Sequence, residues 1–332
     1  MLRINHLIRR REFRTLVFLI ALFIVVGFVN PDFLTLTSIH DVLRNSVIYI
    51  VLVIGMTFVL LTGNIDISIA GVLGLSAAVS GVILRDGGSM MLAVAAAIAI
   101  GCLVGLVNAL GVTKFKISSF IMTLGILGIT RVIQVIYTKG KWVENIPENF
   151  KHISHLKILG VNLLLIIVII VVILLHLYLS KNSRGRYFKA IGDNFDGAIS
   201  LGIPVKRYVT YAFIISSVCA SIAGLIFTSQ VGFISTNAGN GIEMTVIAAA
   251  VLGGVSLSGG VGTVIGAAIG AIILTSINSA LVFMKVPAFW NDTISGTLLI
   301  LIVVIDALLA KRAVRMATRI RLNARVLPGR AD

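Results

Sequence analysis

The residues that could carry chemistry in this chain form no familiar catalytic or nucleotide-binding pattern. No His-Glu-x-x-His sequence places two zinc-binding histidines on one helix face, and no Gly-x-Ser-x-Gly sequence marks a nucleophilic serine. The Gly-Lys pair at Gly140-Lys141 is followed by Trp142 instead of Ser or Thr, so it is not a phosphate-binding loop. We therefore predict no catalytic residue, no cofactor and no metal, and we expect that this chain does not itself hydrolyse ATP.

Four ionisable residues interrupt stretches that are otherwise apolar: Asp66, Arg131, Glu243 and Asp292. A charge at the centre of a bilayer costs about 2.5–3.5 kcal/mol on insertion scales, so each is a candidate functional residue. The carboxylates could instead cap helix N-termini, and Arg131 requires a carboxylate or carbonyl partner. Lone polar residues within spans could also be interhelical hydrogen-bonding groups. The candidates for a translocation path are Asn64, Asp66, Ser68, Glu243, Asn278 and Asp292.

The composition is that of a polytopic membrane protein. Of the 332 residues, 58% are hydrophobic and 12% are charged, and the mean hydropathy is +1.06. Soluble domains typically have about 25% charged residues. The net charge of +15 does not indicate nucleic acid, because Lys and Arg concentrate in the tails and one central loop. Cys102 and Cys219 lie in apolar runs, where a thiol acts as a small hydrophobic group.

Apolar segments predict about ten transmembrane helices and an all-α fold. A span needs roughly 20 apolar residues, and the first one follows Arg9-Arg10-Arg11 with no cleavage motif, so we expect it to be retained. The spans on either side of 63–66 have almost no connection between them, and the segment at 243–260 is short and Gly-rich, so either region could contain a broken or re-entrant helix. The expected spans are 15–30, 46–63, 66–84, 90–113, 117–138, 161–180, 207–230, 243–258, 260–284 and 289–310.

The positive charges predict the orientation of these spans. An even number of spans places both termini on one side, and Lys and Arg gather there in the N-terminal tail 1–14, at Lys114 and Lys116, in the loop 181–206 and in the tail 311–332. Positive residues favour the cytoplasmic side, so we predict that both termini and the central loop are cytoplasmic. The segment 139–160 would then lie outside, and the basic C-terminal tail would contact anionic lipid.

Two segments differ in the packing that their side chains predict. The stretch 161–180 is large and aliphatic all round, which is typical of a helix facing lipid. By contrast, 260–272 carries Gly262, Gly266 and Gly270 at four-residue intervals. This spacing lets a second backbone approach closely, so we interpret the three glycines as helix-packing residues.

The central loop 181–206 contains a short predicted helix over 194–202. Asp193 or Asn194 can cap it, and Gly202 followed by Pro204 ends it. Such a helix spans roughly 12 Å and is too short to be stable alone, so it needs a surface to dock on. That surface could be a partner protein or the membrane face of this chain. The proposed contact positions recur at helical spacing and are Phe195, Ala198, Ile199 and Gly202.

Several motifs together resemble the sugar-type permeases of ATP-binding-cassette importers, the family of the ribose permease. They cover about residues 15–310 and are Leu-Leu-Thr-Gly-Asn-Ile-Asp-Ile-Ser at 60–68, Phe-Ile-Met-Thr-Leu-Gly at 120–125, Gly-Arg-Tyr-Phe-Lys-Ala-Ile-Gly-Asp-Asn with Gly-Ala-Ile-Ser-Leu-Gly-Ile within 185–203, and Val-Leu-Gly-Gly-Val-Ser-Leu-Ser-Gly-Gly-Val-Gly-Thr-Val-Ile-Gly at 251–266. Within the family, the stretches 140–147, 229–235, 241–244 and 286–292 are most similar to autoinducer-2 import permeases of the Lsr type.

The resemblance implies a single permease domain over 15–310, located in the bacterial inner membrane. It implies as partners a second permease subunit, identical or different, two cytoplasmic ATPase subunits and an external substrate-binding protein. Arg186, Asp193 and Asn194 would join the four contact positions in an ATPase-coupling loop. Ribose, rhamnose or another sugar is an alternative substrate to autoinducer-2. A self-contained channel, an ion-coupled carrier and a membrane scaffold are alternatives of other classes.

Overall fold

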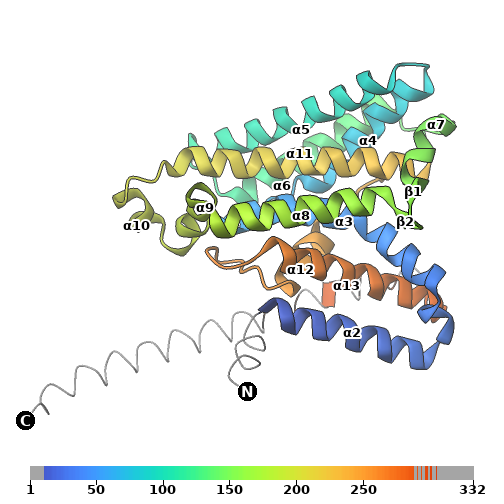
Figure 1. The fold of residues 1–332 in the computed structure, drawn as a ribbon. Helices are drawn as coiled ribbons and strands as arrows, with labels where there is room; N and C mark the ends of the chain where they lie inside the picture. Colours follow the sequence, from blue (N-terminus) through green and yellow to red (C-terminus); the bar gives the residue numbers. More distant parts are fainter. Residues whose placement is uncertain are drawn as a thin grey trace, which may run out of the picture.

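A computed structural model describes residues 11–287 together with residues 290, 293, 296, 297, 300 and 304. Most of the tenth expected span, 289–310, therefore lies outside the described residues. Asp292 and the C-terminal tail 311–332 lie wholly outside them. The described part is a bundle of helices that run roughly alongside one another (Figure 1). Its elements are α2 (Arg11–Val29), η1 (Pro31–Leu34), α3 (Leu36–Leu61), α4 (Ile69–Arg85), α5 (Met90–Thr113), α6 (Ser119–Tyr137), α7 (Glu148–Lys151), η2 (His152–His155), β1 (Lys157–Ile158), β2 (Val161–Asn162), α8 (Leu163–Lys181), α9 (Ser183–Asp193), α10 (Phe195–Ser200), α11 (Val205–Val231), α12 (Ile242–Leu252) and α13 (Val264–Phe283).

Six helices in the described part of the chain are long and apolar enough to cross a membrane: α3, α5, α6, α8, α11 and α13. Three shorter apolar helices, Thr15–Val29 within α2, α4 and α12, coincide with three more of the expected spans. The structure is thus that of a polytopic helical membrane protein. Its small antiparallel hairpin pairs Lys157 with Asn162 and Ile158 with Val161.

The helix α3 begins ten residues earlier than the sequence predicts. Thr35 caps it by accepting a hydrogen bond from the Ser38 backbone N–H. The first turns carry Asp41, Arg44 and Asn45, whose polarity hides the helix from a search for apolar runs. Asp41 and Arg44 form an i,i+3 ion pair at 3.6 Å, which is compatible with a helix surface.

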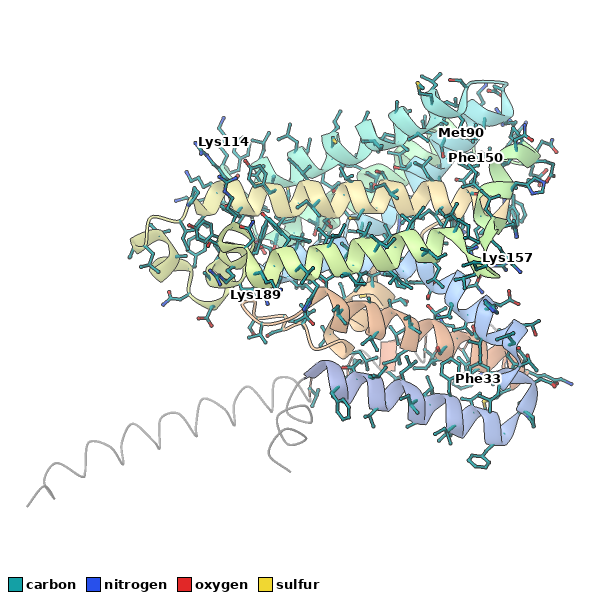
Figure 2. All side chains as sticks on the ribbon, viewed as in Figure 1. Phe33, Met90, Lys114, Phe150, Lys157 and Lys189 are labelled. Carbon is teal, nitrogen blue, oxygen red and sulfur yellow. The ribbon has the colours of Figure 1, made fainter. Side chains whose placement is uncertain are left out.

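The two ends of the bundle have different structures. The helices α9 and α10 lie at one end, called here the α10 end, and α7 with the β1–β2 hairpin lies at the other, called the α7 end (Figure 1). In Figure 2, the labelled Lys114 and Lys189 lie toward the α10 end, and Met90, Phe150 and Lys157 lie toward the α7 end. Successive spans therefore alternate in direction, as short connections require.

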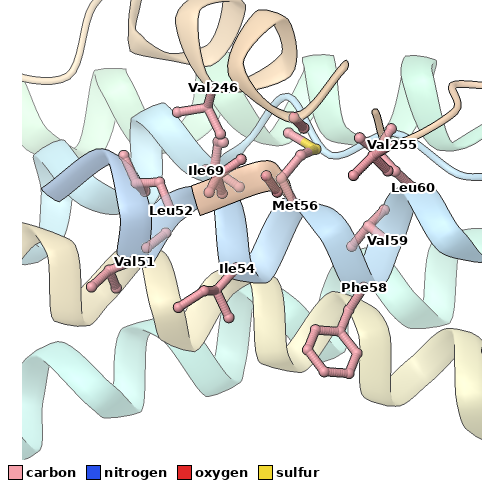
Figure 3. Packing of buried hydrophobic residues seen from close by; sticks show 14 of the residues in the cluster. Val51, Leu52, Ile54, Met56, Phe58, Val59, Leu60, Ile69, Val246 and Val255 are labelled. Carbon is pink, nitrogen blue, oxygen red and sulfur yellow. The ribbon is translucent and has the colours of Figure 1, made fainter. Parts of the chain in front are cut away.

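The core forms around α3, α11 and α13. Within their apolar stretches, 78% of α3, 61% of α13 and 56% of α11 is buried within the chain, against 22% of α8. Met56 of α3 belongs to the same buried cluster as Val246 of α12 and Val255 (Figure 3). The largely exposed aliphatic surface of α8 agrees with the lipid-facing position expected for 161–180.

The predicted break between α3 and α4 is present. Gly63 has φ of +75°, and residues 64–67 are non-helical before α4 begins at Ile69. The Ile65 and Ile67 N–H groups donate to Ser119 Oγ and Thr123 Oγ1 of α6, at 3.2 and 3.1 Å. Two of the backbone donors that the break frees are thus satisfied inside the bundle, as non-helical backbone at membrane depth requires.

A second break follows α12, which ends at Leu252 before Gly253 and Gly254. The segment 253–263 returns to α13 at the α10 end, where the Gly260 N–H donates to the Leu61 carbonyl at 3.1 Å. Gly262 lies in this segment with φ of +149° and packs against Val255, so its expected place on the α13 face is wrong. Gly266 and Gly270 do lie on α13, against the Gly253 and Ala249 carbonyls of the α12 region.

Candidate coupling surface and polar path

The loop 181–206 folds as two helices where the sequence predicts one. The helix α9 is capped by Asn182, whose Oδ1 accepts from the Arg184 N–H at 2.9 Å. Asn194 then caps α10 by accepting from the Gly197 N–H at 2.8 Å, while Asp193 ends α9. Gly202 has φ of +75° just after α10 and ahead of Pro204. The expected cap and stop therefore define α10, which is shorter than 194–202.

The exposed surface of α10 is narrower than the predicted contact face. Phe195 and Ile199 are each 54% exposed, and the neighbouring Leu201 is 81% exposed. Ala198 is 2% exposed and packs in the core cluster. Three apolar side chains are thus exposed at the α10 end, while Ala198 packs α10 against the bundle.

The helix α9 connects α10 to the core. Phe188 is fully buried, with its ring centroid 5.1 Å from those of Phe58 on α3 and Tyr208 on α11. Edge-to-face ring pairs of this kind stabilise contacts beyond their buried area. Arg186 stays exposed and donates to Ser183 Oγ at 3.3 Å on α9 itself. A displacement of α10 would therefore reach α3 and α11 through α9.

A cavity of about 860 Å³ lies between α10, the start of α11 and the end of α5. Phe195 and Ile199 line it from α10, and Asn64 lines it from the break between α3 and α4. Asn64 also donates from its amide to Thr62, at 3.2 Å to the carbonyl and 3.0 Å to Oγ1. The cavity brings a predicted path residue next to the predicted coupling helix.

Asp66 is fully buried at the centre of a hydrogen-bond network. Its Oδ1 accepts from the Ser68 N–H at 3.0 Å and from Ser68 Oγ at 2.5 Å. Its Oδ2 accepts from Ser216 Oγ on α11 at 2.7 Å, and Asn108 of α5 donates to Ser68 Oγ at 2.8 Å. The carboxyl group therefore joins the start of α4 to α5 and α11 through neutral partners.

Glu243 pairs with Arg131, the ionisable residue whose partner the sequence left open. Arg131 Nη2 on α6 lies 3.0 Å from Glu243 Oε1 in the first turn of α12. The Glu243 side chain is 10% exposed and the Arg131 side chain 38% exposed. The second carboxylate oxygen, Oε2, is buried without a partner among the described residues. The pair joins α6 to α12.

The remaining candidates do not join this network. Asn278 lies part-buried on α13, and Asp292 lies outside the described residues. Sequence reasoning missed Ser216, which donates to Asp66, and Thr123, which accepts from the Ile67 N–H, because isolated hydroxyl residues are common in membrane helices. The described residues contain no group of His, Cys, Asp or Glu that could hold a metal ion.

Two exposed carboxylates at the α7 end are held in the charged form. The hydrogen bond from Arg85 lowers the pKa of Asp86, and the hydrogen bond from Lys151 lowers the pKa of Glu148. The segment 232–241 covers part of this end, where Gln134 donates to the Ser235 and Thr236 carbonyls. The α7 end therefore presents fixed charges around a structured connection.

Comparison with known proteins identifies the family. Residues 38–303 match the family described as "Branched-chain amino acid transport system / permease component". The chain belongs to this permease family. The permease is 40% identical over 296 residues, covering 89% of this chain and 86% of the relative, to the autoinducer 2 import system permease protein LsrC of Escherichia coli (strain K12 / DH10B). It is also 39% identical to the LsrC protein of Enterobacter sp. (strain 638) over 323 residues, which cover 97% of this chain and 94% of that relative.

These matches confirm the family resemblance expected from the motifs of this permease. Another LsrC relative, from Salmonella choleraesuis (strain SC-B67), is 40% identical over 296 residues. No solved structure matches the permease chain significantly. A bundle of apolar helices and membership of a transport-permease family together make this a multi-pass membrane transport protein.

Proposed function

We propose that this chain is the permease subunit of an ATP-driven importer that carries autoinducer-2 across the bacterial inner membrane. The observation that supports this most strongly is the 39–40% identity to LsrC import permeases over nearly the whole chain. Identity of this extent includes both broken-helix regions and the loop 181–206. In this proposal a second permease, two ATPase subunits and an external binding protein complete the importer.

The proposal places the α10 end in the cytoplasm and the α7 end outside. Lys114, Lys116 and the basic loop 181–206 lie at the α10 end, which favours the cytoplasmic side. The proposed ATPase contact is made by Phe195, Ile199 and Leu201, three exposed apolar side chains that a partner surface would cover. Asn194 and Gly202 shape this surface, and Ala198 anchors it.

The proposed coupling runs from α10 to the break between α3 and α4. Closure of the ATPases would move α10, and α9 would carry that motion to Phe58 and Tyr208 through Phe188. The 860 Å³ cavity gives α10 room to move relative to Asn64. Such a displacement of packed helices is a common way to switch a bundle between two states.

Reconstitution tests the transport activity. Proteoliposomes with both permeases, the ATPases and the binding protein should import labelled autoinducer-2 only when ATP is present. Ribose or rhamnose should compete weakly at equal concentration. Import by this chain alone, without ATPases, would identify a self-contained carrier and overturn the proposal. Stronger import of a sugar would reassign the substrate.

The coupling surface is tested by Phe195→Asp and Ile199→Asp. Each should reduce co-purification of the ATPase at least fivefold, because a charge enters an apolar contact. The matched control is Ile158→Asp, since Ile158 is 51% exposed at the opposite end of the molecule. ATPase association that is equal in all three variants would rule out α10 as the coupling surface.

A further inference from the structure

A second, smaller cavity lies at the α7 end between α3, α11 and the start of α12. Its volume is about 240 Å³, below the roughly 300–1,000 Å³ of sites for drug-sized ligands, so it suits a smaller molecule. It is separate from both the Asp66 network and the α10 cavity, with which it shares no lining residue. Its lining residues are Arg44, Asn45, Ile48, Tyr49, Phe227, Gln230, Val231 and Ile242.

The polar side of this cavity is made by an amide pair that joins two helices. Gln230 Nε2 at the end of α11 donates to Asn45 Oδ1 near the start of α3, at 2.7 Å. Each side-chain amide has both a donor and an acceptor. Among the described residues, this bond leaves the Asn45 NH₂ and the Gln230 carbonyl without a side-chain partner. Unpaired amide N–H donors thus lie beside the unpaired Gln230 carbonyl, on the exposed side of the cavity.

Arg44 adds an incompletely satisfied cation to the same wall. Its Nη2 is 3.6 Å from Asp41 Oδ1, and its Nε is buried without an acceptor in the described part of the chain. Leaving a buried donor unpaired is costly, so the arrangement is better satisfied when an acceptor is present. The Tyr49 hydroxyl offers a further donor and acceptor at the cavity.

The other wall is apolar, formed by Ile48, Phe227, Val231 and Ile242. A hydroxyl group can accept and donate at once, and a carbon skeleton with several hydroxyls has both polar edges and apolar C–H faces. An isolated anion could accept from Arg44 and from the Asn45 NH₂, but it would leave the Gln230 carbonyl without a donor. A purely apolar molecule would leave all of these polar groups unpaired.

We infer that this cavity binds a small, multiply hydroxylated molecule in the external half of the permease, before it enters the path near Asp66. The inference rests on the proposed function, which places the α7 end outside. Asn45 and Gln230 would hold the hydroxyls, Arg44 would donate to a ligand oxygen, and Phe227 would pack against the carbon skeleton. The site would receive the molecule that the binding protein releases.

The test uses the fully assembled importer in proteoliposomes and three labelled probes: autoinducer-2, ribose and rhamnose. Asn45→Leu and Gln230→Leu should lower import of the transported probe at least fivefold. Stimulation of ATPase activity by the loaded binding protein should stay within twofold of wild type, because the α10 end is unchanged. Val231→Phe, which fills the cavity but removes no hydrogen bond, should have the same effect.

The matched control is Thr37→Val, which makes an exposed polar residue apolar at the same end of α3 but away from the cavity. Import that is unchanged in Gln230→Leu and Val231→Phe would overturn the site while leaving the proposed function intact. If the wild-type importer carries a sugar but not autoinducer-2, only the proposed substrate is overturned. Import by the variants is then measured with that sugar. Import of none of the three would overturn both proposals.

Discussion

At the scale of single residues, Asp66 occupies a buried position formed by neutral hydrogen-bond donors. Two hydroxyls and one backbone N–H point to its oxygens. Asp66→Ala would leave these donors unpaired, at about 1–3 kcal/mol for each buried group. Asp66→Asn keeps one acceptor oxygen, so it should lower the free energy of unfolding less than Asp66→Ala does. We therefore expect Asp66→Ala to lower the melting temperature of the purified permease by roughly 5 °C or more.

The control for Asp66 is Ser80→Ala. Ser80 is also fully buried, but its hydroxyl donates to the Ala77 carbonyl within its own helix, so its removal breaks no link between helices. The melting temperature of Ser80→Ala should remain close to that of wild type in the same fluorescence assay. Equal losses in Asp66→Ala and Ser80→Ala would show that the network adds no specific stability.

The Arg131–Glu243 pair should respond asymmetrically to substitution. Glu243 is the more buried partner, so Arg131→Leu leaves a carboxylate in an apolar setting, while Glu243→Gln leaves a half-exposed cation. Removing one partner of a fully buried pair costs about 3–5 kcal/mol, and solvent at the 38% exposed Arg131 side chain makes the loss here smaller. We expect Arg131→Leu to lower thermal stability more than Glu243→Gln, and the double variant to recover part of the loss. Additive losses in this double-mutant cycle would contradict a direct interaction.

At the scale of elements, glycines set how closely the segments of the α10 end approach. A Cβ on Gly192 of α9 would meet the Leu61 carbonyl and the Gly260 N–H, the two groups that join α3 to the segment 253–263. Gly192→Ala should therefore separate these segments and cost about 1–3 kcal/mol. Gly125 and Gly128 on α6 have no atom within 4 Å of such a Cβ. Their alanine variants should be neutral or slightly stabilising in the same thermal assay.

Sequence patterns predict an element well when the apolar length or the capping residues of that element alone determine it. The apolar length of 90–113 predicts α5 with the observed bounds, and Asn194 predicts the start of α10. The polar first turns of α3 and the whole of α9 escape prediction, because α9 is held by Phe188 packing on distant rings. Likewise, the need of Arg131 for a partner is predictable, but Glu243 lies 112 residues away and only the fold brings it close.

At the scale of the whole molecule, orientation decides which end meets ATP and which meets the substrate. The fold separates Lys157 in the β1–β2 hairpin from Lys114 at the α10 end (Figure 2). Both side chains are exposed, so a cysteine at either position should react readily when reagent reaches it. The native Cys102 and Cys219 can be replaced first by Ser and Ala to give a silent background.

In intact cells whose periplasm is accessible, a membrane-impermeant maleimide should label Lys157→Cys and leave Lys114→Cys unlabelled until the inner membrane is permeabilised. The reason is the clustering of Lys and Arg at the α10 end, which favours retention on the cytoplasmic side. Labelling of the permeabilised sample controls for the reactivity of each thiol. The reverse pattern would place α9 and α10 outside, where no ATPase could contact Phe195, and would separate the polar cavity near Gln230 from the external binding protein.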